Sequence, residues 1–328
     1  QLAQEKRGSL DLEQWASKRG LVGSSEASIN VFAQIRRNAE QAHPVLLWGE
    51  DGTPMLALAT ALLDEADRQD TSVVALRARQ LTSIQIEHSL FGSDTGQRTG
   101  LLADPDHTLI LLGDLERIPR RTQVRIARYL RDGWFSPIGS RRRIVGRARL
   151  VLSAQQPPEK LLEASLLDTD LAAVIGAGAI RVPPLRERHD DIEQLLIANL
   201  QRMAPMSAVT LDPSARRALL INSWPGNDRQ LQELASRLIA GGKLDAITAT
   251  DIARLTDEVT ETQPLNASER ERLLQALWRH RFSRQKTADF LGISRKTLYN
   301  RMQRHGLLNH SAKSAANDKP DAMPDKSV

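Results

Sequence analysis

Short apolar runs alternate with longer amphipathic stretches from residue 21 to residue 240. The apolar runs are rich in Val, Leu and Ile, as buried strands of a parallel sheet are. Four strands are predicted, at residues 44–48, 72–76, 108–112 and 150–153. The amphipathic stretches between them are helix candidates. This order predicts an α/β domain in which helices cover a mostly parallel sheet.

The pattern changes after residue 185, where strand patterns end. Amphipathic stretches follow that predict a small helical subdomain, at residues 191–203, 212–221, 227–240 and 250–259. Trp224 lies between two of them and is expected to pack this subdomain against the sheet domain.

A helix-turn-helix is predicted farther along. Ser268 and Glu271 form a capping-box pattern before an apolar-periodic stretch, so a helix begins there. A second, short helix fits residues 284–291, and Gly292 supplies a tight turn. Ser294 can cap a third helix, which ends near residue 306.

The third helix has an apolar and a cationic side. Leu298 and Met302 are four residues apart and are expected to pack inward. The outward side chains are Arg295, Lys296, Tyr299, Asn300, Gln303 and Arg304. Residues 279–304 contain eight Lys or Arg residues and a single acidic residue. Charge alone fits two interpretations, a DNA reader that neutralises phosphates or a protein-interaction bundle with a solvated face.

Composition narrows the function classes. The 328 residues include no cysteine, which excludes disulfides, thiolate nucleophiles and Cys-type zinc sites, and no metal site is expected. Lys and Arg number 45 against 40 Asp and Glu, a net charge of +5. No run of eighteen apolar residues occurs, so we expect a cytoplasmic protein without membrane contact.

Residues 44–56 have the layout of a phosphate-binding loop, with a strand, a short turn and an Ala/Leu-rich helix. The turn residues that could hold a nucleotide are Gly49, Glu50, Asp51, Gly52 and Thr53. Pro54 stands where a glycine amide is needed, and Met55 stands where a lysine is needed. Taken alone, the stretch also fits an ordinary strand–turn–helix.

A second cationic stretch follows residues 137–139. It contains Arg141, Arg142, Arg143, Arg147 and Arg149. A solvated hairpin face and an auxiliary contact with DNA or an acidic partner both fit this pattern.

Residues 285–302, QKTADFLGISRKTLYNRM, resemble the Fis-type helix-turn-helix. The resemblance places Ser294, Arg295, Thr297 and Asn300 at the major groove, with Arg295 suited to bidentate contact with guanine. The full predicted DNA-binding set is Ser294, Arg295, Lys296, Thr297, Tyr299, Asn300, Arg301 and Arg304. Fis-type units act as dimers, so the resemblance implies at least a homodimer.

Four further short segments follow one another along the chain. They are LVGSS at 21–25, SLFG at 89–92, PPLRER at 183–188 and WPGN at 224–227. The order resembles that of sigma-54-dependent enhancer-binding transcription regulators, over residues 21–308. It implies an AAA+ α/β domain with a helical lid, followed by a Fis-type reader. Family members form rings that hydrolyse ATP and remodel sigma-54 polymerase through a GAFTGA loop. The stretch before residue 21 is too short for the receiver domain of many relatives.

Several family positions are changed. The GAFTGA loop reads GQRTGL, so Arg98 replaces its phenylalanine. Gly113 and Asp114 stand at the family's Asp-Glu pair, which binds magnesium. With a one-residue gap Asp114 matches the glutamate, and without it neither carboxylate is kept. Asp168 and Val174 stand at the arginines that act on a neighbouring subunit. The lid arginine is kept as Arg229. The resemblance therefore predicts vestigial nucleotide binding, with weak ATP or ADP binding at most, no required cofactor and no enzyme activity.

The leading hypothesis is a sequence-specific DNA-binding regulator that acts without ATP hydrolysis or sigma-54 remodelling, on a self-associating AAA+ scaffold. The alternatives are a sigma-54-dependent ATPase activator with atypical motifs and a non-catalytic partner of an active AAA+ relative. RNA polymerase is a further candidate partner. The expected division is an extension (1–20), the α/β subdomain (21–185), the lid (186–259), a linker (260–267), the helix-turn-helix (268–308) and a disordered tail (309–328).

Overall fold

The chain forms two compact units, Gln1–Val259 and Thr260–Val328. The computed structural model describes residues 2–41, 43–63, 73–94, 100–104, 109–242, 244–261 and 284–290, and residues 295, 298, 299 and 302. Arg98, most of the predicted linker, the helix predicted from Ser268 and the predicted tail lie outside the described residues.

The first unit is built on a five-stranded parallel sheet with strand order β2-β3-β6-β1-β7. Its strands are β1 (Val45–Trp48), β2 (Val73–Arg77), β3 (Leu109–Gly113), β6 (Arg149–Ala154) and β7 (Ala179–Arg181). Four of them begin and end within one residue of the predicted strands. The prediction omitted β7, because three residues with a single buried apolar side chain, Ile180, give no strand pattern.

Helices cover both faces of the sheet, because successive strand residues point to opposite sides. Leu46, Ile110 and Leu152 join the core on one face. The helices on that face are α5 (Ser83–Phe91), α6 (Arg120–Asp132), α7 (Pro158–Glu163) and α8 (Thr169–Ile175). Val45 and Leu47 join the core on the other face. The helices there are α1 (Leu2–Lys18), α2 (Glu26–Gln41) and α3 (Met55–Thr60).

The segment expected as an N-terminal extension is the helix α1. Its Ala16 is buried in the core beneath α2 and α3, and Trp15 packs against the same core. Arg36 of α2 forms an ion pair with Asp11 of α1 at 2.6 Å. This helix is therefore part of the folded unit.

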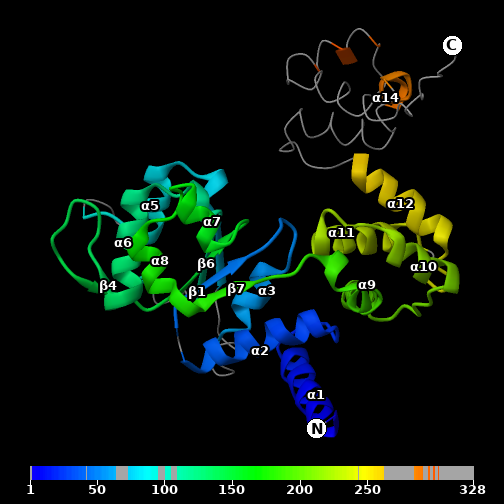
Figure 1. Cartoon of the computed structure of the whole chain (residues 1–328), viewed down its shortest axis with the longest axis horizontal. Coiled ribbons are helices and arrows are strands. Elements are labelled where there is room, and N and C mark those ends of the chain that lie inside the picture. The colour runs from blue at the N-terminus through cyan, green and yellow to red at the C-terminus, as the bar shows by residue number, and fades with distance from the viewer. Residues whose placement is uncertain are drawn as a thin grey trace, which may run out of the picture. The chain divides into compact units, whose positions relative to one another are not determined.

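The helical subdomain has its own core. Its helices are α9 (His189–Met203), α10 (Pro213–Ile221), α11 (Asn227–Ala240) and α12 (Ala249–Glu261), which match the four predicted stretches (Figure 1). Trp224 is fully buried at their centre, and its indole nitrogen donates to the Leu219 carbonyl at 2.8 Å. The core that contains Trp224 also includes Leu185, so Trp224 packs within the lid and against the segment that enters it.

An antiparallel hairpin of β4 (Trp134–Phe135) and β5 (Ile144–Val145) follows α6, as the arginine-rich stretch predicted. In the second unit, the predicted short helix is α14 (Arg284–Phe290). Leu298 and Met302 are buried, which confirms their inward packing. Among the described residues, no helix combines the length and apolar character needed to cross a membrane.

Candidate functional site

Residues 49–54 connect β1 to α3 at the carboxyl ends of the strands, the edge where open α/β sheets bind ligands. The loop is tightly confined. A Cβ on Gly49 would lie 2.5 Å from the carbonyl oxygen of Val182. Gly52 has φ +85, and a Cβ there would collide with the backbone of Gly226 in the lid. Both glycines are thus required by close backbone approach.

Pro54 and Met55 stand at the start of α3. Pro54 is its N-cap residue and has no N–H to offer a phosphate. Met55 packs partly against the apolar core beneath the sheet. Both residues also line the cleft described below, but neither brings a positive charge to it.

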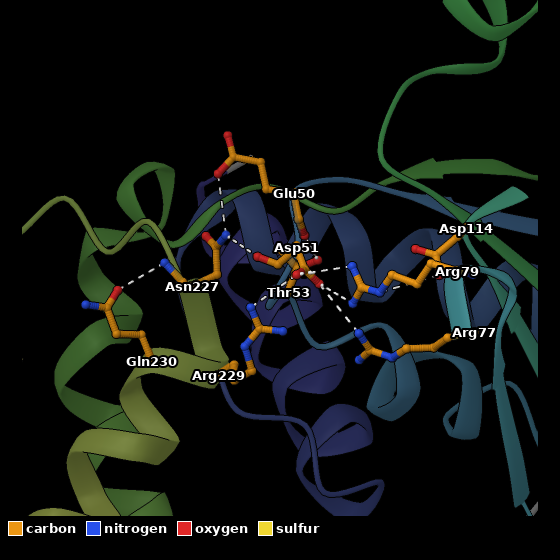
Figure 2. Close-up of polar contacts among 10 residues, drawn as sticks. Glu50, Asp51, Thr53, Arg77, Arg79, Asp114, Asn227, Arg229 and Gln230 are labelled. Atoms are coloured by element: carbon orange, nitrogen blue, oxygen red, sulfur yellow. Dashed lines mark hydrogen bonds and ion pairs between the residues drawn. The ribbon is translucent and has the colours of Figure 1, made fainter. Parts of the chain in front are cut away.

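Three arginines instead converge on Asp51 in the middle of the loop (Figure 2). Nη2 of Arg229, in the first turn of α11, lies 3.2 Å from Oδ2 of Asp51. Nη2 of Arg79 lies 3.4 Å, and Nη1 of Arg77 3.7 Å, from Oδ1. Burial disfavours the charged carboxylate, but Arg229 and Arg79 outweigh it and lower the pKa of Asp51.

Arg79 also reaches the end of β3. Its backbone N–H donates to Oδ2 of Asp114 at 3.3 Å, and its Nε lies 3.7 Å from the same oxygen. Asp114 directly follows Gly113 and adopts a left-handed backbone conformation with φ 61. Two residues on, burial raises the pKa of Glu116. Two carboxyl groups in different environments thus follow β3, Asp114 beside Arg79 and Glu116 with a pKa raised by burial.

The lid is joined to the loop by polar contacts. Asn227 donates from Nδ2 to the Asp51 carbonyl at 3.0 Å and accepts from the Leu185 N–H at 2.8 Å. The Arg229 N–H donates to the Gly52 carbonyl at 3.0 Å. Arg186 donates to Glu50 at 2.7 Å, and this hydrogen bond lowers the pKa of Glu50. These hydrogen bonds attach the lid to residues 50–52 of the loop.

Asp191 makes a second joint between the lid and the sheet domain. Its buried carboxylate accepts from the backbone N–H groups of Ser24 and Ser25, each at 2.7 Å. It also accepts from the hydroxyls of Ser25 at 2.7 Å and Ser28 at 2.6 Å. These bonds fix the approach to α2 against the first turn of α9.

Two adjoining pockets lie between the sheet domain and the lid. One, of about 450 Å³, is lined by the loop, the ends of β2, β3 and β6, and the start of α11. The other, of about 260 Å³, is lined by the segment before α2, by α3, and by α9 of the lid. They share Pro54, Ala57, Asp228 and Gln232. Together they form one cleft of the size that small-molecule sites have.

The structure brings the six predicted nucleotide-binding residues together around this cleft. They are Gly49, Glu50, Asp51, Gly52, Thr53 and Arg229. Gly113 and Asp114 line it too. Asp168 lies elsewhere, where it caps α8 and faces Arg120 at 3.5 Å, and Val174 packs against the sheet core.

Only two of the eight predicted DNA-binding residues, Arg295 and Tyr299, are described, and both are exposed. The remaining six lie outside the described part of the chain. The prediction of the cleft missed Arg77, Arg79 and Asn227. Arg77 could have been found, because it directly follows a predicted strand whose carboxyl end points to the loop.

The first unit has a parallel sheet with a phosphate-loop layout after β1 and a helical lid whose arginine reaches that loop. These features define an AAA+ domain. Residues 21–180 match the model of the Sigma-54 interaction domain, and residues 186–270 match the AAA+ ATPase lid domain. Residues 264–305 match the model described as Bacterial regulatory protein, Fis family. The chain belongs to the sigma-54-dependent enhancer-binding family of transcription regulators.

Individual relatives agree with this assignment. The chain is 30% identical over 308 residues to the transcriptional regulatory protein ZraR of Salmonella typhimurium, covering 88% of this chain and 69% of ZraR. It is 29% identical to the Nif-specific regulatory protein of Azotobacter vinelandii, covering 92% of this chain and 61% of that protein. The crystal structure of NtrX from Brucella abortus in complex with ATP is similar with a TM-score of 0.60 and 26% identity, over 87% of this chain and 69% of NtrX. The chain spans 48% to 64% of the length of three of its relatives.

These comparisons correct the expectation that the chain is not an enzyme. Its lid matches that of AAA+ ATPases, and the similar NtrX structures contain ATP or ADP, so the family points to ATPase activity. The expectation that the chain needs no cofactor is not supported either, because the similar NtrX structures contain ATP or ADP. The expectation rested on the joint loss of the lysine, the carboxylate pair and the arginines that act on a neighbouring subunit, and it left out cations that other segments bring to the loop. Arg77, Arg79 and Arg229 bring cations to the loop from segments that are distant in the sequence.

Proposed function

We propose that this chain is a DNA-binding transcription regulator that binds ATP in the cleft beneath its lid and hydrolyses it. Its helix-turn-helix reads duplex DNA, with Arg295 at the base edges. Arg77 and Arg79 supply, from β2 and the turn after it, the positive charge that Met55 lacks. The single observation that carries the proposal is the convergence of Arg77, Arg79 and Arg229 on the loop.

The residues of the cleft suit a nucleoside triphosphate. Guanidinium groups form charge-assisted, often bidentate hydrogen bonds with phosphate. The same three arginines form ion pairs with the carboxylate of Asp51. An anion is therefore favourable at this position. Bound ATP would supply the phosphoryl group, and the residues of this chain would hold it, with Arg229 acting from the lid. Asp114 would keep Arg79 in place.

The test combines two variants with opposite expected effects. Arg79→Ala should weaken ATP binding by about 10- to 100-fold, because a hydrogen bond to a charged group contributes about 1.5–3 kcal/mol. Asp51→Asn should strengthen it by about 3- to 10-fold, because the carboxylate competes with phosphate for the same cations. Binding is measured with a fluorescent ATP analogue, and hydrolysis by phosphate release with magnesium present.

Arg217→Ala is the matched control, because Arg217 is exposed on α10 and does not line the cleft. It should bind and hydrolyse ATP as the unchanged protein does. The proposal fails if Arg79→Ala behaves like this control, or if the unchanged protein releases no phosphate.

A further inference from the structure

Residues 117–149, on the sheet domain, carry a large excess of positive charge. They contain eleven arginines, no lysine and one acidic residue, Asp132. The segment includes α6, the β4–β5 hairpin and the start of β6. A local excess of this size indicates contact with a polyanion or a solvated face. The contacts of each arginine distinguish these interpretations.

Two of the arginines hold the fold together. Arg125 lies 3.1 Å from Glu87 and donates to the Ser136 carbonyl at 2.6 Å. Arg149 donates to the Leu62 carbonyl at 2.7 Å. Both side chains are therefore structural and unavailable to a partner.

Arg143 is exposed and stacks on the Trp134 ring, with 4.2 Å between its guanidinium carbon and the ring centroid. Six others are exposed and form neither an ion pair nor a contact with an aromatic ring among the residues that the structure describes. They are Arg117, Arg121, Arg128, Arg141, Arg142 and Arg147, here called the arginine surface. The positive charge of this surface is not neutralised from within. Burial lowers the pKa of Arg125, and the nearby charges of Arg121 and Arg128 act in the same direction.

The helical part of this surface is one face of α6. Arg121, Val124 and Arg128 are separated by three and four residues, so they follow one side of the helix. The opposite side is buried, with Gln123 and Ile126 inside the sheet domain. The guanidinium groups therefore project along the outer face of a helix about 20 Å long.

The hairpin is fixed beside that helix (Figure 1). Gly133 ends α6 with φ 73 and accepts from the Gly146 N–H at 3.0 Å. The Tyr129 hydroxyl donates to the Ala148 carbonyl at 2.6 Å. These bonds hold the exposed arginines of α6 and those of the hairpin on neighbouring elements at a fixed separation.

The composition of the surface favours nucleic acid over a protein partner. Protein interfaces have an apolar centre, whereas interfaces with DNA are polar and strongly positive. The exposed apolar residues of this segment are Val124 and Val145, which lie singly among the arginines. Duplex DNA carries one charge per about 1.7 Å of its axis with both strands counted, so a length of about 20 Å carries about a dozen phosphates, of which one side faces the surface.

We propose that the arginine surface binds the phosphate backbone of duplex DNA independently of base sequence. The chain then binds DNA at two places. The helix-turn-helix binds a specific base sequence, and the sheet domain binds the phosphates of any sequence. Neither ATP nor the cleft is part of this inference, so it stands apart from the nucleotide proposal above.

The test uses the full chain and a random-sequence duplex of about 30 base pairs, with affinity measured by fluorescence anisotropy over a series of salt concentrations. The variant Arg121→Gln/Arg128→Gln/Arg141→Gln/Arg142→Gln removes four charges. The matched control, Arg37→Gln/Lys160→Gln/Arg217→Gln/Arg254→Gln, removes four exposed charges elsewhere. The slope of log affinity against log salt should fall by about 3 to 4 in the variant, because each phosphate contact contributes about 0.9. The control slope should change by less than about 1.

A hairpin variant, Arg141→Gln/Arg142→Gln, guards against misfolding of the fourfold variant and should lower the slope by about 2. Arg295→Ala can be combined with the fourfold change. It should lower the preference for the specific sequence, and the difference in salt slope between the fourfold variant and the control should stay the same. Equal slopes in variant and control would overturn the proposal and leave an acidic protein as the partner to test.

Discussion

At the residue scale, two adjacent acids of the loop are held by different arginines. Glu50 faces Arg186 in the turn that enters the lid, whereas Asp51 faces Arg229, Arg79 and Arg77. The pKa of each carboxyl is lowered, by the Arg186 hydrogen bond for Glu50 and by the arginines against burial for Asp51. The attachment of the lid to the loop therefore depends on pH.

The direction of this dependence follows from the lowered pKa values. A carboxyl whose pKa falls on folding stabilises the fold when it is ionised, and loses that effect as the pH drops through the folded value. We expect Glu50→Gln/Asp51→Asn to cost under about 2 kcal/mol at pH 7, because partly exposed ion pairs contribute little. The Tm of the variant differs from that of the unchanged protein at pH 7. This difference should shrink as the pH falls below 4.5 and 3.8, the ordinary pKa values of Glu50 and Asp51. A constant Tm difference between pH 7 and pH 3 would contradict the assignment.

Arg295 is a second residue with a specific expected effect. It is exposed on the helix whose Leu298 and Met302 are buried, so its side chain is available to DNA. Arg295→Ala should cost about 1–3 kcal/mol of discrimination at one base position per half-site. Competition gel shifts with substituted operators measure this loss, and Arg254→Ala in the first unit is the control. Unchanged base preference would exclude the assigned role.

At the element scale, the lid core contains one large aromatic side chain, that of Trp224. Trp224 lies in the turn before α11 and is buried among residues of α9, α10 and α11. Its backbone has φ 48, and Asn227, three residues on, has φ 50. The turn that carries Trp224 thereby also directs Asn227 toward the loop.

Trp224→Ala should therefore damage both the lid and the cleft. Truncation of a buried aromatic residue costs about 3–5 kcal/mol, which is a large part of the stability of a small subdomain. We expect an early unfolding transition of the lid in calorimetry and rapid proteolysis within residues 186–261. Ile221→Ala, at a side chain 85% exposed on α10, should change the stability by under about 0.5 kcal/mol. A variant as stable as this control would show that the lid core does not depend on Trp224.

The elements that the sequence predicted well share a physical property. Buried parallel strands such as β1 and β3 are continuous apolar runs, and the lid helices have a clear apolar stripe, so local pattern suffices. The helical packing of α1 was not predicted, because its few apolar residues find their partners on α2 and beneath the sheet. The arginine cluster at the loop was missed for a similar reason, since Arg79 and Arg229 lie 150 residues apart and meet only through the fold.

At the scale of the whole molecule, three of the four segments that resembled the family join the lid to the sheet domain. Residues 21–25 contain the serines bound by Asp191, and residues 183–188 meet Asn227 of the WPGN turn through the Leu185 N–H. Arg188 and Asp228 add a buried ion pair at 2.6 Å between the same segments. Such joints tolerate few residue types because several backbone groups must be satisfied at once. That explains why short segments could identify the fold, although the chemistry of the cleft could not be predicted from them.

The Asp191 joint also determines how a displacement of the lid would spread. Four hydrogen bonds connect the first turn of α9 to the start of α2, so a rotation of the lid must either break them or carry that end of α2 along. The helix α2 is a rigid rod about 24 Å long. Its far half bears Arg36, which is paired with Asp11 of α1. Val31 and Ile35 of α2 and Ala16 of α1 are buried in the core beneath the sheet, so both helices are anchored to the sheet domain. The Asp191 joint therefore acts as a brake, because a swing of the lid has to pull against that core.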